Sequence, residues 1–158
     1  KLLVSLLYSL VALVLLTGVA LGAGTARYGW HPLRTTVAGE IAAGPALLRL
    51  LGILGYLAVT LLVVAGLAFL LSVSTDSPLG AVGGAVGLII VSNILDAITA
   101  LGGWREILPS HWQFAWISAL QSQITWTGMI EGAAVSVSYA IVLFALAFRR
   151  FRTRDIVS

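Results

Sequence analysis

The chain has few charged side chains, a single lysine and no cysteine. Only 9% of its 158 residues are charged, 59% are hydrophobic and the mean hydropathy is +1.05, whereas soluble domains carry about 25% charged residues. So few charges cannot cover the surface of a water-soluble fold. The missing cysteines exclude disulfides, thiolate metal sites and cysteine nucleophiles from this chain. The composition therefore favours an integral membrane protein.

Common enzyme signatures are missing as well. The only lysine, Lys1, leaves no GxxxxGK[ST] motif with which this chain would hold ATP, and HExxH and GxSxG are also absent. The histidines, His31 and His111, lie far apart and each stands beside a tryptophan. Because they lack the ligand spacing of a zinc site, we expect them at a membrane interface rather than on a metal. We expect no enzyme activity, metal or cofactor in the chain itself.

Four long apolar runs predict an all-α integral membrane protein. The first, Leu2 to Ala23, contains no charged residue and, at about 1.5 Å per residue, is long enough to cross the hydrocarbon core. A cleaved signal peptide is the alternative, but its apolar core would be only about 7–15 residues long. Because the chain starts at the edge of this run, we expect the full protein to continue upstream. The predicted spans are residues 2–23, 50–73, 78–95 and 132–148.

Polar segments connect these spans. Residues 24–49 are mixed in character and are expected to form an external connection. Residues 74–77 form a short polar turn, and the Pro78 that follows suits the first turn of a helix. The Gly44-Pro45 pair is expected to mark a break within the first connection.

The second external connection, residues 96–131, holds four of the five tryptophans and is too polar to span. Within it, Trp112, Ala115 and Trp116 recur at helical spacing, and Pro109 could open that helix. Tryptophan is enriched at membrane interfaces. We therefore expect an amphipathic or re-entrant helix at the membrane surface.

The arginine-rich tail, residues 149–158, orients the chain. With four spans, both ends and the turn at 74–77 lie on one side, which the positive-inside rule identifies as the cytosol. A basic cluster directly after a span indicates orientation and lipid head-group binding rather than nucleic-acid binding. The turn is either a plain connection or a contact to a partner. The candidates for cytosolic contact are Ser74, Thr75, Asp76, Arg149, Arg150, Arg152 and Arg154.

The third predicted span is rich in glycine. Small residues let helices approach closely in lipid, either within this chain or between two subunits. Leucine in place of Gly84 should therefore disturb packing more than leucine in place of Ala81. The residues expected at helix contacts are Gly80, Gly83, Gly84 and Gly87.

Polar residues at the outer ends of the last two spans are candidates for a translocation path or an external gate. Asp96 closes the third predicted span and Glu131 opens the fourth, so both are expected near the same face. Such groups either line a polar path, pair with Arg105 or form solvated helix ends. Together with nearby polar and aromatic side chains, the candidates are Asp96, Gln121, Gln123, Trp126 and Glu131.

Four stretches, taken in order, give the chain a family resemblance. They are KLLVSLLYSLVALVLL, FLLSVSTDSPLGAVGGAVGLII, ILPSHWQFAW and ALAFRRFRTRDI. The chain thereby resembles, over nearly its whole length, the permease subunit of a bacterial ATP-binding-cassette exporter of the type 2 family. That family includes drug and antibiotic self-resistance exporters.

The resemblance implies six spans with both termini cytosolic, of which this chain matches the third to the sixth. The segment 96–131 would correspond to the family's short external helices before the last span. The implied partners are two copies of an ATPase subunit, which bind ATP and Mg, and a second permease subunit. The coupling helix through which such an ATPase acts lies between the second and third spans, so the main ATPase contact falls on no residue of this chain.

We therefore expect a multi-pass permease of the bacterial cytoplasmic (inner) membrane that exports an amphiphilic, drug-like or lipid-like substrate, with ATP hydrolysed by a separate subunit. Two alternatives stay open. A secondary transporter or channel would more typically carry ionisable residues inside its spans. A membrane scaffold without transport would use the glycine-rich span and the tryptophans only for packing.

Overall fold

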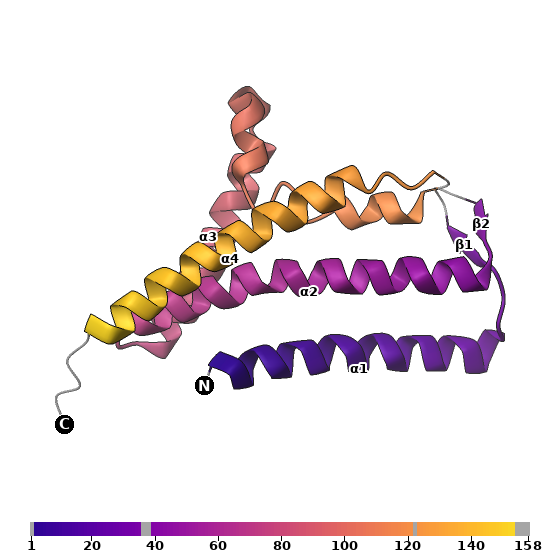
Figure 1. Ribbon diagram of the computed structural model, residues 1–158, viewed down its shortest axis with the longest axis horizontal. Helices are drawn as coiled ribbons and strands as arrows, with labels where there is room; N and C mark the ends of the chain where they lie inside the picture. The colour runs from indigo at the N-terminus through magenta and orange to yellow at the C-terminus, as the bar shows by residue number, and fades with distance from the viewer. Residues whose placement is uncertain (1, 36–38, 122, 154–158) are drawn as a thin grey trace. The chain divides into compact units, whose positions relative to one another are not determined.

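A computed structural model describes residues 2–35, 39–121 and 123–153 of the chain (Figure 1). The described part contains long α-helices, one short hairpin and two short 3-10 helices. In chain order the elements are α1 (Leu2–Tyr28), β1 (Leu33–Thr35), β2 (Gly39–Ile41), α2 (Ala43–Ser74), α3 (Pro78–Ala97), η1 (Thr99–Ile107), η2 (Ala115–Leu120) and α4 (Thr127–Thr153).

Four of these helices are long and apolar enough to cross a membrane. Large apolar side chains such as Leu7, Val14 and Leu16 are exposed along α1. No residue in the most apolar 18-residue stretch of α1 is buried. Water does not favour apolar surface of this extent, whereas a helix suits lipid because its backbone groups bond one another. The prediction of an all-α, multi-pass membrane protein is confirmed at this level. The stretches long and apolar enough to span are Leu6–Tyr28, Ala43–Ser74, Pro78–Ala97 and Thr127–Arg152.

The helices extend beyond the apolar runs from which they were predicted. α1 continues past Ala23 to Tyr28. The next residue, Gly29, has a φ of 76°, and its N–H donates to the Thr25 carbonyl at 2.8 Å. A glycine in the left-handed conformation is a common helix end because it has no Cβ. Pro45 marks no break: it lies in the first turn of α2, where its missing N–H breaks no helical hydrogen bond.

The chain divides into two compact units, and the first comprises Lys1–Ala58 with Phe114–Ile130. Between α1 and α2, strands β1 and β2 pair antiparallel, with Leu33 opposite Ile41 and Arg34 opposite Glu40. The sequence indicated only an irregular connection here. The buried side chains of this unit come from β2, α2, η2 and the start of α4, and include Ile41, Ile53, Tyr56, Ala119 and Met129.

The second unit comprises Val59–Gln113 with Glu131–Ser158. Its helices approach closely at two glycines. A Cβ added to Gly66 of α2 would lie 3.2 Å from Leu143 Cβ of α4, and one added to Gly84 of α3 would lie 3.1 Å from Leu71 Cδ1 of α2. Ala81, where leucine was expected to disturb packing less than at Gly84, is itself only 4% exposed. Small residues at helix contacts are typical of membrane proteins.

The turn between α2 and α3 is fixed by Ser77. Its hydroxyl accepts a hydrogen bond from the Gly80 N–H at 3.1 Å, and Pro78 occupies the first turn of α3, as predicted. An N-cap serine satisfies one of the N–H groups that a helix leaves without a partner. The turn therefore starts α3 directly after α2.

The Trp-rich segment is helical, but it forms two 3-10 helices rather than one α-helix. Residues 109–114, which include Trp112, lie in turns between η1 and η2. Pro109 supplies no N–H, and Gly102 has φ 53° and ψ −132°, which kinks η1. Short 3-10 pieces are usual where a chain bends often.

Candidate functional site

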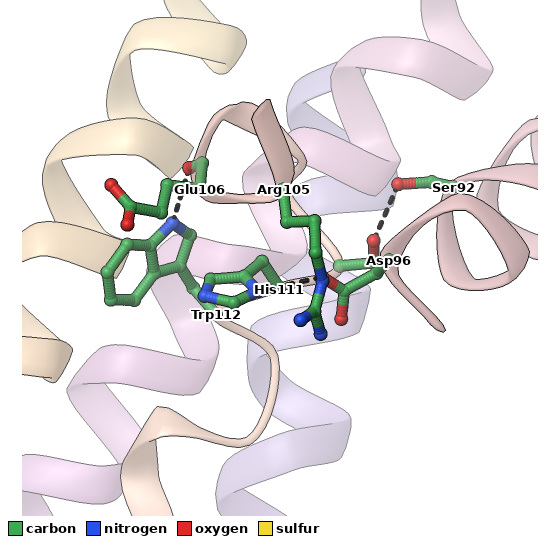
Figure 2. A network of polar contacts seen from close by, with 7 residues as sticks. Ser92, Asp96, Arg105, Glu106, His111 and Trp112 are labelled. Carbon is green, nitrogen blue, oxygen red and sulfur yellow. Dashed lines mark hydrogen bonds and ion pairs between the residues drawn. The ribbon is translucent and has the colours of Figure 1, made fainter. Parts of the chain in front are cut away.

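A group of side-chain polar contacts in the second unit lies at the end of α3 (Figure 2). Asp96 Oδ1 accepts a hydrogen bond from Arg105 Nε at 3.3 Å and lies 2.7 Å from His111 Nδ1. Where the Asp96 carboxylate is ionised it can only accept, so the hydrogen bond is then donated by His111 Nδ1–H. These three residues, the Asp96 cluster below, have side chains that are 22–28% exposed. The cluster thus gives a carboxylate at the end of a span two donors, one of them a permanent cation.

The chain reverses direction after α3, and this reversal assembles the cluster. Ile98 leaves the helix with φ −82° and ψ 96°, while its N–H still donates to the Leu95 carbonyl at 3.1 Å. The kink at Gly102 uses a backbone conformation that is strained for residues with a Cβ. As a result η1 packs against α3, and Arg105 reaches Asp96.

Further contacts hold the stretch that carries His111 (Figure 2). The hydroxyls of Ser92 in α3 and the buried Ser110 lie 2.7 Å apart, and Trp112 Nε1 donates to the Glu106 carbonyl at 2.8 Å. The rings of His111 and Trp112 meet edge to face, with centroids 5.1 Å apart. A satisfied polar network restricts the groups that form it. Residues 105–112 are therefore held on the end of α3.

In the first unit, Arg49 of α2 binds the end of η2. Its Nη1 donates to the carbonyls of Ala119 at 3.2 Å and Gln121 at 2.7 Å. The last carbonyls of a helix lack partners within that helix, and a cation there also complements the helix dipole. Thr35 Oγ1 of β1 adds a longer hydrogen bond of 3.4 Å to the Leu120 carbonyl. We call these contacts the Arg49 clamp.

Of the two acidic candidates, only Asp96 lies in a polar site. Glu131 belongs to the same unit, but its side chain is exposed and takes part in none of the contacts of the Asp96 cluster. Asp96 pairs with Arg105, which was one of the alternatives for it. The two carboxylates therefore do not form a joint site in this structure.

The other three gate candidates lie in the first unit. Gln121 enters the Arg49 clamp through its backbone carbonyl, and Gln123 is exposed. The ring of Trp126 lies beside α2, with Cζ3 3.6 Å from where a Cβ on Gly52 would be. Trp126 thus packs on the helix that carries the clamp.

The glycines of α3 have different surroundings. A Cβ added to Gly84 would meet Leu71, and one on Gly80 would meet the N-cap of its own helix at 3.4 Å. An added Cβ on Gly83 or Gly87 meets no atom within 4 Å. Close approach within the chain is therefore seen at Gly84, and the open faces of Gly83 and Gly87 leave room for another helix.

The candidates for cytosolic contact lie in the turn after α2 and at the end of α4. Thr75 Oγ1 accepts from the Ser77 N–H at 3.2 Å, which tightens the turn. Arg150 and Arg152 lie in the last turn of α4, where a cation is favoured by the helix dipole. Arg154 lies outside the described residues. The cytosolic side of these residues stays a prediction.

Sequence reasoning missed the roles of His111 and Arg49. His111 was expected only at an interface, and Arg49 was assigned to the external connection. Arg49 directly precedes the apolar run 50–73, where an unpaired charge is costly, and that was the available signal for it. His111 lies in the middle of the polar segment 96–131, so the sequence offered no such signal for it. Within the described part of the chain, no group of three or more His, Asp or Glu side chains is arranged to hold a metal ion.

Comparison of the chain with protein-family models, with curated proteins and with solved structures finds no match.

Proposed function

We propose that the chain is the membrane-spanning permease subunit of a bacterial exporter driven by a separate ATPase of the ATP-binding-cassette type. The order of elements carries this proposal: helices α1 to α3 are long enough to span, two short 3-10 helices follow, and α4 ends in arginines. The family that the sequence resembles has the same order from its third to its sixth span.

The polar contacts support a restraining role for the external segment. The Asp96 cluster holds η1 and the following turns on α3, and the Arg49 clamp holds η2 on α2. Asp96 lies in the last turn of α3 with Arg105 as its charged partner, and Arg49 lies in the second turn of α2 and donates to backbone carbonyls, so neither is at mid-span without a partner. Coupling ions are bound by ionisable groups inside spans, so this arrangement favours an energy source outside the chain. A partner ATPase is such a source.

The exposed apolar surface supports assembly in the bacterial inner membrane with a second permease subunit. No residue in the most apolar 18-residue stretch of α1 is buried. A Cβ added to Gly83 or Gly87 of α3 meets no atom of the chain within 4 Å, so this side of α3 is free for contact. These surfaces suit contact with lipid or with further helices. An amphiphilic, drug-like or lipid-like substrate suits a path between helices of this composition.

Purification and reconstitution of the full-length protein test the proposal. We expect an ATP-binding-cassette ATPase to copurify in mild detergent from the native host, and amphiphile transport by proteoliposomes to require that partner. An ATPase variant lacking its P-loop lysine is the control and should abolish transport. ATP hydrolysis by the purified permease alone, or transport without any ATPase, would refute the assignment.

Labelling of introduced cysteines tests the orientation. The chain contains no cysteine, so single cysteines at Ala100 and Thr153 can be labelled without background. We expect an impermeant maleimide to reach Ala100→Cys from outside the cell and Thr153→Cys only after the membrane is opened. Labelling of both from the same side contradicts four spans.

A proton-coupled secondary transporter is the second candidate, because the Asp96 and His111 side chains share a hydrogen bond of 2.7 Å at the end of a span. This candidate predicts uptake or export driven by a pH gradient alone. It also predicts that Asp96→Asn abolishes that transport while leaving the protein folded.

A further inference from the structure

A cavity of about 330 Å³ opens between α1 and α2 of the first unit. We call it the α1–α2 groove. Its volume is at the lower end of the range for small-molecule sites, about 300–1,000 Å³. Its walls are largely apolar and include Leu21, Gly24, Trp30, Leu47, Leu50 and Leu120.

His31 lines both the groove and a second, more polar cavity. Its other lining residues are Tyr28, Pro32, Arg34 and Glu40, so it lies between the end of α1 and the hairpin. A ligand that extends from the groove past His31 would therefore pass from apolar to polar and charged surroundings. An amphiphile with one apolar chain and a polar head has this distribution.

We propose that the α1–α2 groove binds one acyl chain of a membrane phospholipid, whose phosphate lies near Tyr28, His31 and Arg34. Both walls of the groove are helices long and apolar enough to span a membrane, so the surrounding bilayer supplies the ligand. A water molecule occupies about 30 Å³ and a methylene group is of similar size, so the groove holds roughly ten methylenes. This site requires membrane insertion of the chain and does not depend on an ATPase or on transport.

The charges around the polar cavity select an anionic head group. Arg34 and Glu40 form a salt bridge of 2.7 Å, but their side chains are 84% and 56% exposed, and such surface pairs are weak. The guanidinium has further N–H donors that suit a phosphate. Arg27, in the last turn of α1, adds a second positive charge. Two positive charges against one negative charge favour an anionic phospholipid.

Two glycines of α1 provide a matched test. A Cβ added to Gly24 or to Gly22 meets no atom within 4 Å, but only Gly24 lines the groove. Gly24→Phe is therefore expected to place its ring in the groove with its Cβ clear of protein atoms, whereas Gly22→Phe places the same ring elsewhere on α1. Ala46→Phe fills the groove from α2 and guards against a folding defect caused by the change in α1.

The probe is a phosphatidylglycerol that carries a photoreactive diazirine on one acyl chain. After reconstitution of the full protein and illumination, mass spectrometry should locate the label on residues 20–25 and 46–50. Gly24→Phe and Ala46→Phe should reduce this labelling by about tenfold or more, because displacing even two methylenes lowers affinity by about that factor. Gly22→Phe should label like the unmodified protein. No labelling of these residues, or equal labelling of all variants, would overturn the proposal.

Lipids with the same acyl chains separate head-group recognition from chain binding. Phosphatidylglycerol should label the groove more strongly than phosphatidylcholine, and Arg34→Ala should remove the difference. Equal labelling by both lipids would overturn the phosphate site. Labelling that appears only when the subunit is separated from its assembly would show that another protein helix occupies the groove, and would overturn the acyl-chain site. Because no step uses ATP, failure of this test leaves the exporter proposal untouched, and the converse also holds.

Discussion

Replacing Arg49 with alanine is expected to release η2 from α2. The side chain donates two hydrogen bonds to backbone carbonyls at the end of η2, at 2.7 and 3.2 Å. Hydrogen bonds that involve a charged group contribute about 1.5–3 kcal/mol each, and the longer of these two lies at the limit of good geometry. We therefore expect the substitution to destabilise docking of residues 114–126 by about 3 kcal/mol.

The loss of docking free energy in Arg49→Ala should be measurable as more frequent undocking of η2 from α2. A loss of about 3 kcal/mol raises the population of the undocked state roughly 100-fold, since 1.36 kcal/mol corresponds to a factor of ten. Hydrogen exchange in nanodiscs reports this change at amides that bond within the segment, such as Ile117 and Gln121. Arg49→Lys should give an intermediate result, because an ammonium lacks the planar geometry of the guanidinium.

Arg34→Ala is the matched control in the same unit. It removes an arginine whose salt bridge to Glu40 is mostly exposed, and such a pair contributes about 0–1 kcal/mol. Protection of residues 114–126 should then change little. Similar loss of protection in Arg34→Ala and Arg49→Ala, or a loss spread evenly over all helices, would refute the role given to the clamp.

Three further changes test the second unit. Asp96→Asn should lower the free energy of unfolding of the purified protein, measured by thermal denaturation, by about 2 kcal/mol, because Arg105 and His111 lose a charged acceptor. Glu131→Gln, at an exposed site, should have no measurable effect. Ser110→Ala should destabilise by about 1 kcal/mol in the same assay, since it removes one buried neutral hydrogen bond. Gly84→Leu should disrupt folding of the separated subunit, as judged by size-exclusion chromatography, because an added Cβ there meets Leu71. Gly83→Leu should leave that folding intact because its added Cβ meets no atom of the chain within 4 Å. Equal behaviour of the two separated variants would contradict the packing argument.

The spans were predictable because their signal is local. An apolar run of about 20 residues has the length that a helix needs to cross the hydrocarbon core. Each of the four predicted runs lies within one observed helix. The helix ends were not predictable from hydropathy, because a helix continues into the interface as long as nothing breaks its hydrogen bonds. α1 ends at Tyr28, directly before Gly29, where φ becomes positive, rather than at the end of the apolar run at Ala23.

The candidate site was predictable only in part. Asp96 was recognised by its place at the end of an apolar run, but its partner His111 lies fifteen residues away and depends on the chain reversal. In the Arg49 clamp the acceptors are backbone carbonyls, which every residue has, so no pattern of side chains in the sequence predicts this contact. The spacing of Trp112, Ala115 and Trp116 suits several kinds of helical turn, which is why it indicated helical structure without revealing the 3-10 form.

The lengths of α2 and α3 have a consequence for the bilayer around them. α2 has 32 residues and α3 has 20, so at 1.5 Å per residue they measure about 48 and about 30 Å. A bilayer with a hydrocarbon thickness of about 30 Å matches α3 when that helix stands upright, whereas α2 must tilt or project into the head-group region. The two helices therefore differ in hydrophobic mismatch. In a thicker bilayer α2 should stand more upright, whereas α3 becomes shorter than the hydrocarbon thickness and the bilayer around it must become thinner.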